Sequence, residues 1–351
     1  KFWKKPTACN VCGHKKVTKI VFEKSRRKSK SKSNCNVLLP HVRCCKHACN
    51  HRCSLISYSV FRGSRICPSE LLDSLQSYSK QKTMQAPSIM SICKDTGLAR
   101  NQVEHIVSAL STVEAEAAKE ASGALQLAGD LEGDCCAVRK TYVGSANPHY
   151  QAEIMAARER WLAAQKKVTS AVRQKATKLV WMLHVRVIGI CQRGGNMAMQ
   201  MLPYKLCPKG GRPVIESTQE IIDSKLLQDN VKARGKHTLH TDGCWSWPAA
   251  RKKLGLKNTT SKRRNHSMRQ YAHAVEDVPK SLSKITGTMS VDARWNSLQK
   301  FMPDGMKTRQ TRQVNGDIEK RSWQWLWRHN MPDRAKLLEE LGRACGLHCM
   351  K

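Results

Sequence analysis

Carboxylates in the middle and later parts of the chain have the types and spacing of a metal site. Asp130, Glu132 and Asp134 alternate, so all three would project to one face of a strand. Asp242 stands where another strand is expected to end, the usual place for a site residue in an α/β sheet. Asp292 lies on an expected helix, at the edge of its apolar stripe. Such acids could converge on one or two Mg²⁺ ions, which would hold the attacking and leaving oxygens of a phosphodiester.

Cysteines near the N-terminus have the spacing of a second, structural metal site. Cys9-x-x-Cys12 is followed about thirty residues later by Cys44-Cys45 and Cys49, and two such pairs match a tetrahedral zinc ribbon. The sequence predicts Cys9, Cys12, Cys45 and Cys49 as the ligands, with Cys44 as the alternative to Cys45. Other substitutes in this region are His47, His51 and Cys53. The chain shows no secretory signal, so clustered cysteines favour metal over disulfides.

The charge of the chain indicates a polyanionic partner. Lys and Arg number 62 against 27 acidic residues, which gives a formal net charge of +35 and a pI near 9.9. DNA and RNA are the commonest such partners, because each neutralised phosphate releases a condensed counterion. There is no run of eighteen apolar residues, so no transmembrane helix is expected. We expect an intracellular protein, in the nucleus of a eukaryote or in the cytoplasm and nucleoid of a bacterium.

Residues 66–122 are expected to form helices. A short helix over Ile89–Lys94 is followed by Asp95-Thr96-Gly97, and a longer helix then carries apolar residues on one face. Helix, glycine-containing turn and helix are typical of a helix-turn-helix. In that interpretation Arg100, Asn101 and Gln102 lie near the start of the recognition helix, where side chains reach DNA base edges.

From residue 123 onward strands and helices alternate, which predicts a mixed α/β domain. The expected strands are Leu131–Val143, Leu179–Cys191, Asn196–Leu202 and Thr238–Thr241. The expected helices are Ser217–Asn230, Ala249–Leu254, Thr288–Phe301 and Asn315–Arg328, with a charged helical insertion over Gln151–Lys178.

A basic stretch lies between the second and third acids. Arg251–Arg269 holds eight Lys and Arg among nineteen residues and no acid. A positive rim there would position DNA through its phosphates without reading its sequence. The candidate phosphate contacts are Lys252, Lys253, Lys262, Arg263, Arg264 and, on the helix that carries Asp292, Lys300.

Several segments, spread over nearly the whole chain, carry a more specific pattern. They are Arg43–Phe61, Glu132–Asp134 with Thr141–Gly144, Leu239–Gly243, Asn265–Ser267, Val291–Lys300 and Trp327–Asn330. In this order they resemble the ISXO-like insertion-sequence transposases, which have a zinc ribbon and a DDE-type, RNase H-like catalytic domain.

The resemblance implies a function and its residues. It implies a metal-dependent transposase that binds transposon-end double-stranded DNA, cleaves it and transfers the strand, and that works as a homo-oligomer on DNA. Asp134, Asp242 and Asp292 would be catalytic and hold Mg²⁺ or Mn²⁺, while Zn²⁺ would be structural. Candidates of second rank beside them are Glu132, His240 and His266.

The expected organisation has four parts: a zinc ribbon with a basic loop (1–65), the helix-turn-helix segment (66–122), the catalytic domain (123–330) and a helical tail (331–351). The chain departs from the family in its third acid, Asp292, where Glu is usual, and in Cys135 after the first block. Two alternatives therefore stay open: a transposase-derived zinc-ribbon protein that binds DNA but has lost catalysis, and a nuclease or resolvase that only hydrolyses DNA.

Overall fold

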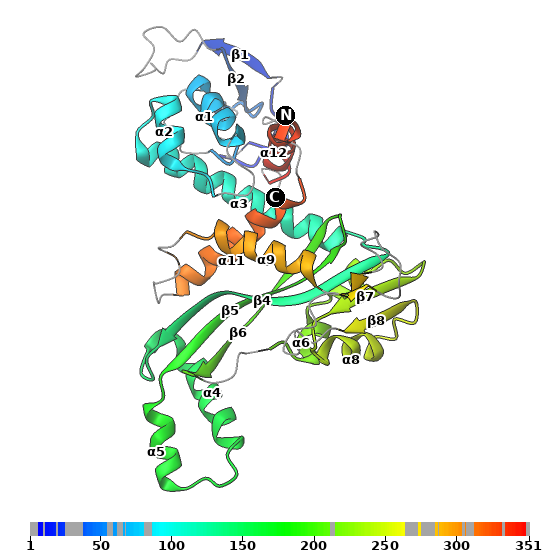
Figure 1. Ribbon diagram of the computed structural model, residues 1–351. Helices are drawn as coiled ribbons and strands as arrows, with labels where there is room; N and C mark the ends of the chain where they lie inside the picture. The colour runs from blue at the N-terminus through cyan, green and yellow to red at the C-terminus, as the bar shows by residue number, and fades with distance from the viewer. Residues whose placement is uncertain are drawn as a thin grey trace. The chain divides into compact units, whose positions relative to one another are not determined.

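Figure 1 shows the computed structural model of the chain. The structure describes residues 6–9, 11–18, 20–24, 38–54, 59–61, 66, 68–80, 86–210, 215–263, 273–274, 285–286, 288–303, 306, 312–331 and 334–348. The chain divides into two compact units, Lys1–Ala118 with Trp327–Lys351, and Lys119–Leu326.

A small antiparallel sheet begins the first unit. Its strands are β1 (Val21–Lys24), β2 (Leu38–Arg43) and β3 (Arg52–Ser54), in the order β1-β2-β3. In the register, Val21 lies opposite His41 and Val42 lies opposite Cys53. Val42 is buried and Arg43 is exposed, as expected for alternate residues of a strand.

Helices complete the first unit. They are α1 (Pro68–Lys80), α2 (Ile89–Thr96), the start of α3 (Arg100–Ala124), the end of α11 (Arg312–His329) and α12 (Arg334–His348). The Ser88 side chain caps α2 by accepting from the Ser91 N–H, and Gly97 ends this helix at a φ of 69°. The predicted glycine turn between α2 and α3 is therefore present, while its use as a DNA-binding helix-turn-helix stays a prediction. The predicted tail helix is α12, which packs against α1.

A buried charged network lies inside the first unit. Arg328 Nη2 contacts Glu114 Oε1 at 3.0 Å, and both side chains are fully buried. The hydroxyl of Tyr78 donates to Glu114 Oε2 at 2.7 Å, and the Arg328 guanidinium lies 4.7 Å from the Tyr78 ring centroid. These three residues come from α1, α3 and α11, so the network ties three helices together.

The second unit is built on a mixed five-stranded sheet. Its strands are β4 (Asp130–Val143), β5 (Trp181–Gln192), β6 (Met197–Pro208), β7 (His237–Thr241) and β8 (Thr259–Arg263), in the order β6-β5-β4-β7-β8. The pairs β4–β5 and β5–β6 are antiparallel, whereas β4–β7 and β7–β8 are parallel. The predicted mixed α/β domain is confirmed, and β8 is a strand that the sequence pattern did not predict.

Helices cover both faces of this sheet (Figure 1). On one side lie α6 (Thr218–Asp223), α7 (Leu226–Asn230) and α8 (Ser246–Lys253), and on the other lie α9 (Met289–Phe301) and α11. Two glycines let tryptophans approach the strands. A Cβ at Gly133 would lie 2.9 Å from the Trp247 ring, and one at Gly189 would lie 2.8 Å from the Trp295 ring. Each helix layer therefore presses one indole onto the sheet.

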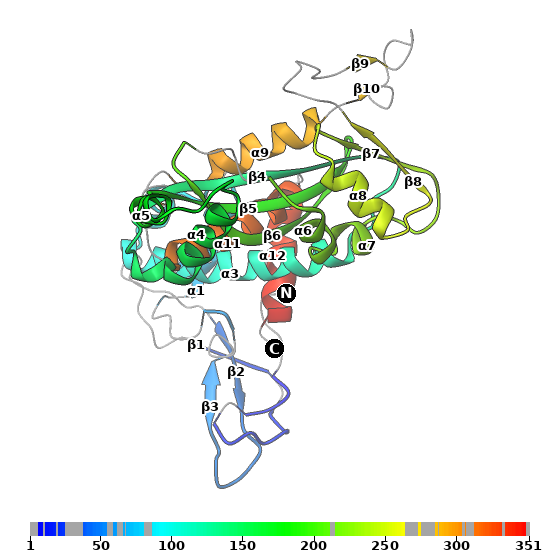
Figure 2. The same ribbon diagram turned by 90° about the horizontal axis from the view of Figure 1, so that it is seen from below.

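The predicted insertion forms a helical hairpin between β4 and β5. Its helices are η2 (Pro148–Tyr150), α4 (Gln151–Ala163) and α5 (Ser170–Lys178), and they extend from one end of the sheet in Figure 1. Tyr150, Ile154 and Trp181 are buried in the small core at its base. A further short antiparallel pair, visible in Figure 2, joins β9 (His273–Ala274) to β10 (Ile285–Thr286).

Candidate functional site

Four cysteines of the first unit form a compact thiol cluster. The Sγ atoms of Cys9, Cys12, Cys44 and Cys49 all lie within 4.8 Å of one another. The Cys9–Cys49 distance is 3.8 Å and the Cys12–Cys44 distance is 3.6 Å. A tetrahedron with Zn–S bonds of about 2.3 Å has edges of about 3.8 Å. The four thiols therefore have the spacing of a structural zinc site.

Backbone N–H groups support the charged state that zinc needs. The Val11 N–H points to Cys9 Sγ at 3.5 Å, and the Lys46 N–H points to Cys44 Sγ at 3.4 Å. Hydrogen bonds from the backbone of Cys12 and Val11 lower the pKa of Cys9 to about 7. At Cys44 burial outweighs the N–H group and raises the pKa of the thiol to about 12. Because a thiolate and not a thiol is the zinc ligand, the two N–H groups favour metal binding, and a bound cation would offset the cost of burial at Cys44.

The cluster corrects the sequence-based choice between two adjacent cysteines. Cys44 is buried in the cluster and Cys45 is exposed. The reason is strand alternation: the chain stays extended beyond β2, through a bridge between Val17 and Cys44, so Val42 and Cys44 share the buried side. Cys45 therefore faces away, and neither His47 nor His51 belongs to the cluster. The side chain of Cys53 lies outside the described residues.

We expect Cys44→Ser to release zinc, whereas Cys45→Ser retains it. Removing one of four thiolate ligands weakens the site, so that a chelator can compete for the metal, while Cys45 contributes no ligand. The measurement is zinc per chain, by elemental analysis, after dialysis against a chelator. Equal zinc retention by the two variants would contradict the assignment of Cys44.

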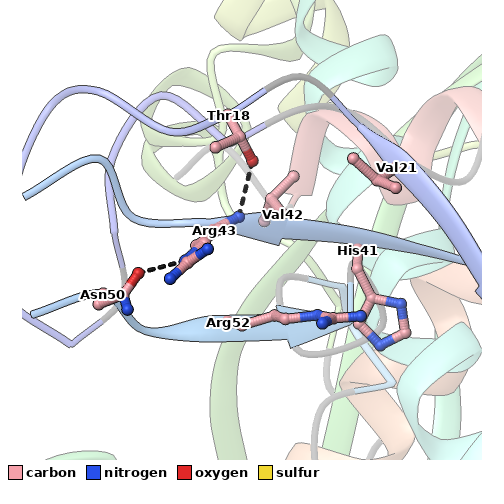
Figure 3. A pocket seen from close by; sticks show the side chains of 7 residues that line it. All are labelled: Thr18, Val21, His41, Val42, Arg43, Asn50 and Arg52. Atoms are coloured by element: carbon pink, nitrogen blue, oxygen red, sulfur yellow. Dashed lines mark hydrogen bonds between the residues drawn. The ribbon is translucent and has the colours of Figure 1, made fainter.

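A hollow of about 450 Å³ lies on the small sheet (Figure 3). The residues that line it are Thr18, Val21, His41, Val42, Arg43, Asn50 and Arg52. The Arg43 N–H donates to Thr18 Oγ1 at 2.9 Å, and its side chain bonds Asn50 Oδ1. Arg43 and Arg52 give this hollow a positive lining.

The register of the large sheet places two predicted acids side by side. In the parallel pair β4–β7, Glu132 lies opposite His240 and Gly133 lies opposite Thr241. The next residues along the two strands are Asp134 and Asp242, and Asp242 directly follows the end of β7. Because side chains alternate along a strand, Glu132 and Asp134 project to the same face. This is the face that α9 covers, since Trp295 of α9 contacts Asp134.

Glu132 positions the helix that carries the third acid. Its side chain is buried, and Oε2 accepts from the Ser290 and Val291 N–H groups at 2.8 and 2.9 Å. Oε1 accepts from Arg193 Nε at 2.7 Å. A carboxylate on the first turn of α9 satisfies free N–H groups and complements the helix dipole. Both oxygens of Glu132 are thus engaged, and its role in the fold is to fix the turn from which Asp292 projects.

Asp134 occupies an environment that disfavours its charge. Burial raises the pKa of this carboxyl well above its ordinary value; the Cys135 N–H opposes this, and the charges of Asp242, Glu216 and Asp292 add to it. Trp295 Nε1 donates to Asp134 Oδ2 at 3.0 Å. A half-buried carboxyl among other carboxyls is destabilised when it is ionised, and a bound cation would offset that destabilisation.

The other two predicted acids are held by local hydrogen bonds. Asp242 Oδ1 accepts from the Cys244 N–H at 2.9 Å, which shapes the turn after β7. Asp292 Oδ2 accepts from the Thr288 hydroxyl at 3.2 Å, one helical turn earlier. Among the described residues, only the four cysteines have all their donor atoms within 4.8 Å, so the carboxylates form a less compact set.

A fourth carboxylate, Glu216, lies near this group, and the sequence reasoning missed it. Glu216 is buried and accepts from Trp247 Nε1 at 2.7 Å. Burial raises its pKa, and the charge of Asp242 adds to the effect. Glu216 stands just before the capping residue Ser217 of α6, where no strand or helix periodicity marks it. Its only sequence signal is an acid next to a helix start, which is common in proteins.

His240 is fully buried on β7, opposite Glu132 of β4. Its Nε2 lies 3.2 Å from Asp130 Oδ1, and burial lowers its pKa, which favours the neutral ring. The structure thus places His240 beside Asp130 and away from solvent. His266 and Arg264 lie outside the described residues.

The basic candidates differ in what they contact. Lys252 and Lys253 are exposed on α8, Lys262 and Arg263 are half-buried at the end of β8, and Lys300 is exposed on α9. On α3, Arg100 pairs with Glu104 at 2.7 Å, the Asn101 side chain is exposed, and Gln102 Oε1 accepts from the Ala99 N–H at 3.2 Å. Gln102 is thus partly used to start its own helix.

Asp134→Asn is expected to stabilise the metal-free protein at neutral pH. The carboxyl has an unfolded pKa of about 3.9. The pKa of this carboxyl is raised in the folded chain. Its contribution to the free energy of unfolding is therefore fully present below about pH 4, and it is lost as the pH rises through the folded pKa. The amide of the variant carries no charge at any pH, so the variant becomes more stable relative to the native chain as the pH increases. Each kcal/mol of this difference raises Tm by roughly 2–4 °C.

The measurement is thermal unfolding from pH 4 to pH 8 without added divalent metal. Asp229→Asn, at an exposed position on α7, is the control and should show no such trend. If Asp134→Asn is less stable than the native chain at pH 7, the raised pKa of this carboxyl among its acidic neighbours is contradicted.

Among the helices of the described residues, none combines the length and the hydropathy of a membrane-spanning segment.

Comparison with other proteins adds no assignment. No family model, no curated protein and no solved structure matches this chain.

Proposed function

We propose that the chain binds double-stranded DNA and cleaves and transfers its phosphodiester bonds with divalent metal, as a DDE-type transposase does. One observation carries this proposal. Asp134 and Asp242 come directly after the last paired residues of the neighbouring strands β4 and β7, and α9 supplies Asp292, whose charge acts on Asp134. The residues on two strands and a helix are those that the sequence predicted for metal-dependent phosphoryl transfer.

The topology of the sheet supports the proposal. Numbered in chain order, its strands are arranged 3-2-1-4-5, with the first three antiparallel and the last two parallel to the first. This arrangement is compatible with an RNase H-like domain, the fold implied by the resemblance to ISXO-like transposases. Fold does not imply function, so the argument rests on the carboxylates and not on the sheet.

The carboxylates suit Mg²⁺ or Mn²⁺. Hard divalent cations take oxygen ligands, and the carboxylates of Asp134, Asp242 and Asp292 would hold them. Bound there, such ions would supply an activated water or 3′-hydroxyl and a counter-charge for the leaving oxygen. The chain itself would orient the acids: Trp295 Nε1 fixes Asp134, the Cys244 N–H fixes Asp242, and Glu132 fixes the start of α9.

The charge of the chain supports DNA as the substrate. The net charge is +35, and exposed lysines of α8 lie on the helix that follows Asp242. In the proposal these lysines, with Lys262, Arg263 and Lys300, contact phosphates around the acids. The ribbon, with its structural zinc, and the α2–α3 segment bind the transposon end. Cutting paired transposon ends calls for a homo-oligomer on DNA. The proposal places the protein with that DNA, in the nucleus of a eukaryote or in the cytoplasm and nucleoid of a bacterium.

The experiment is metal-dependent nicking of supercoiled plasmid. The native chain and the triple variant Asp134→Asn, Asp242→Asn, Asp292→Asn are incubated with plasmid and Mn²⁺ or Mg²⁺, with Asp229→Asn as a matched control on the same unit. We expect nicking by the native chain and the control, and none by the triple variant. If all of them retard the plasmid in a gel and none cuts it, the catalytic proposal fails and the non-catalytic DNA-binding protein replaces it.

A further inference from the structure

One tryptophan of the second unit is exposed beside the carboxylates. Trp245 is 71% exposed, whereas Trp247, two residues later on α8, is fully buried. The guanidinium of Arg263 lies over the Trp245 ring, with Cζ 3.2 Å from the ring centroid. A large aromatic side chain gains by burial, so an indole left in solvent and held by an arginine is unusual. The contact fixes the orientation of the ring and places a positive charge on it.

Trp245 and Arg263 lie at the same end of the sheet as Asp242, where the parallel strands β7 and β8 end. Trp245 is the residue just before α8, in the turn shaped by the Asp242–Cys244 hydrogen bond. Arg263 is the last residue of β8, and the parallel register places it opposite Thr241, the residue before Asp242. In Figures 1 and 2, α8 lies beside β8, and the Arg251 side chain bonds the Thr259 carbonyl between them. The Trp245 indole and the Asp242 carboxylate therefore lie at the same end of the sheet.

On the side away from the carboxylates, the segment that leads from α8 to Arg263 is positive. The segment from Arg251 to Arg263 contains six Lys and Arg and no acid. Lys252, Lys253 and Lys257 are exposed in this segment. A flat apolar ring among cations fits a nucleic-acid strand better than an apolar protein partner, because bases stack on the ring while the cations contact phosphates.

We propose that Trp245, held by Arg263, is a stacking platform for an unpaired nucleobase of the DNA strand beside the carboxylates. The proposal rests on the proposed function and names a further DNA contact for it. A base inside a duplex already has both faces stacked, so only an unpaired or extruded base can offer a face to the indole. Stacking there would hold one nucleotide, and hence the neighbouring phosphate, close to Asp242.

The experiment compares blunt DNA with DNA that has an unpaired tail. Binding of a duplex with a single-stranded tail and of the same duplex without it is measured by fluorescence anisotropy, without added divalent metal so that the DNA is not cut. The variants are Trp245→Ala and Trp245→Phe. The matched control is Tyr142→Ala, since Tyr142 is also exposed, with Lys209 5.1 Å from its ring centroid, but lies at the opposite end of β4 from Asp134.

We expect Trp245→Ala to weaken binding of the tailed duplex by about 5- to 150-fold, the range for loss of one base–aromatic stack, and to change blunt-duplex binding less than about twofold. Trp245→Phe and Tyr142→Ala should bind both DNAs nearly as the native chain does. Unchanged binding of the tailed duplex by Trp245→Ala, or an equal loss for both DNAs, overturns the stacking proposal while the proposed function stands. A native chain that binds neither DNA overturns both.

Discussion

Replacing Asp242 by Asn is expected to slow metal-dependent DNA nicking by about 1,000-fold or more, which corresponds to roughly 4 kcal/mol of lost transition-state stabilisation. Asp242 directly follows the end of β7, next to Asp134 on the neighbouring strand β4. An amide keeps the size of the side chain and can still accept from the Cys244 N–H, so the turn should survive. What it loses is the charge that binds a divalent cation.

The measurement is the rate at which supercoiled plasmid disappears with Mn²⁺ in excess. DNA binding, measured separately by gel retardation, should stay within about threefold of native, since a lost acid does not weaken contacts to phosphates. Asp229→Asn should nick at the native rate. Nicking by Asp242→Asn within about tenfold of native would mean that this carboxylate does not hold the metal.

Replacing Arg328 by Met is expected to destabilise the first unit by about 3–5 kcal/mol. The substitution keeps the length of the apolar stem but removes the guanidinium that contacts the fully buried carboxylate of Glu114. Tyr78 would still donate to Glu114, but a neutral hydroxyl does not replace the positive charge of the guanidinium. The effect is larger than the net worth of the ion pair, because it is the penalty for the charge left behind.

The measurement is chemical unfolding followed by a probe of the first unit. The matched control is Arg343→Met on α12, where the arginine pairs with Glu339 at 3.4 Å and is 55% exposed, and its effect should stay below about 1 kcal/mol. The double variant Arg328→Met, Glu114→Leu should recover much of the loss, because both charges of the buried ion pair are then removed. A loss for Arg328→Met as small as that for Arg343→Met would contradict the buried network.

The sequence predicted the elements that have strong periodicity. The alternating acids of β4, the apolar run of β5 and the stripe of α9 all specify their structure locally, and these elements form as expected. The strand β8 was missed because Thr259–Arg263 has no apolar residue and so no alternation of apolar and polar side chains. Its strand conformation is set by backbone pairing with β7. The predicted helix Ser217–Asn230 is two short helices, separated by Lys225 with a φ of 58°.

The site was predicted less completely than the fold. Asp134 was predicted from the alternation of acids along a strand and Asp242 from the end of another strand, but their adjacency depends on a parallel register between strands about a hundred residues apart. Glu216 and the partner of Arg328 were beyond reach for the same reason, since contacts between distant segments leave no local pattern. Cys44 could have been chosen over Cys45 from the alternation with Val42, had the extended chain been continued past Arg43.

The central claim is that Asp134 and Asp242 together hold a divalent cation. The most direct measurement is a titration of the zinc-loaded chain with Mn²⁺, with free Mn²⁺ followed by electron paramagnetic resonance. The account predicts that the native chain binds on the order of one or two Mn²⁺ and that the double variant Asp134→Asn, Asp242→Asn binds none at the same concentrations. Equal Mn²⁺ binding by the two chains, or no binding by the native chain even with DNA present, would contradict it.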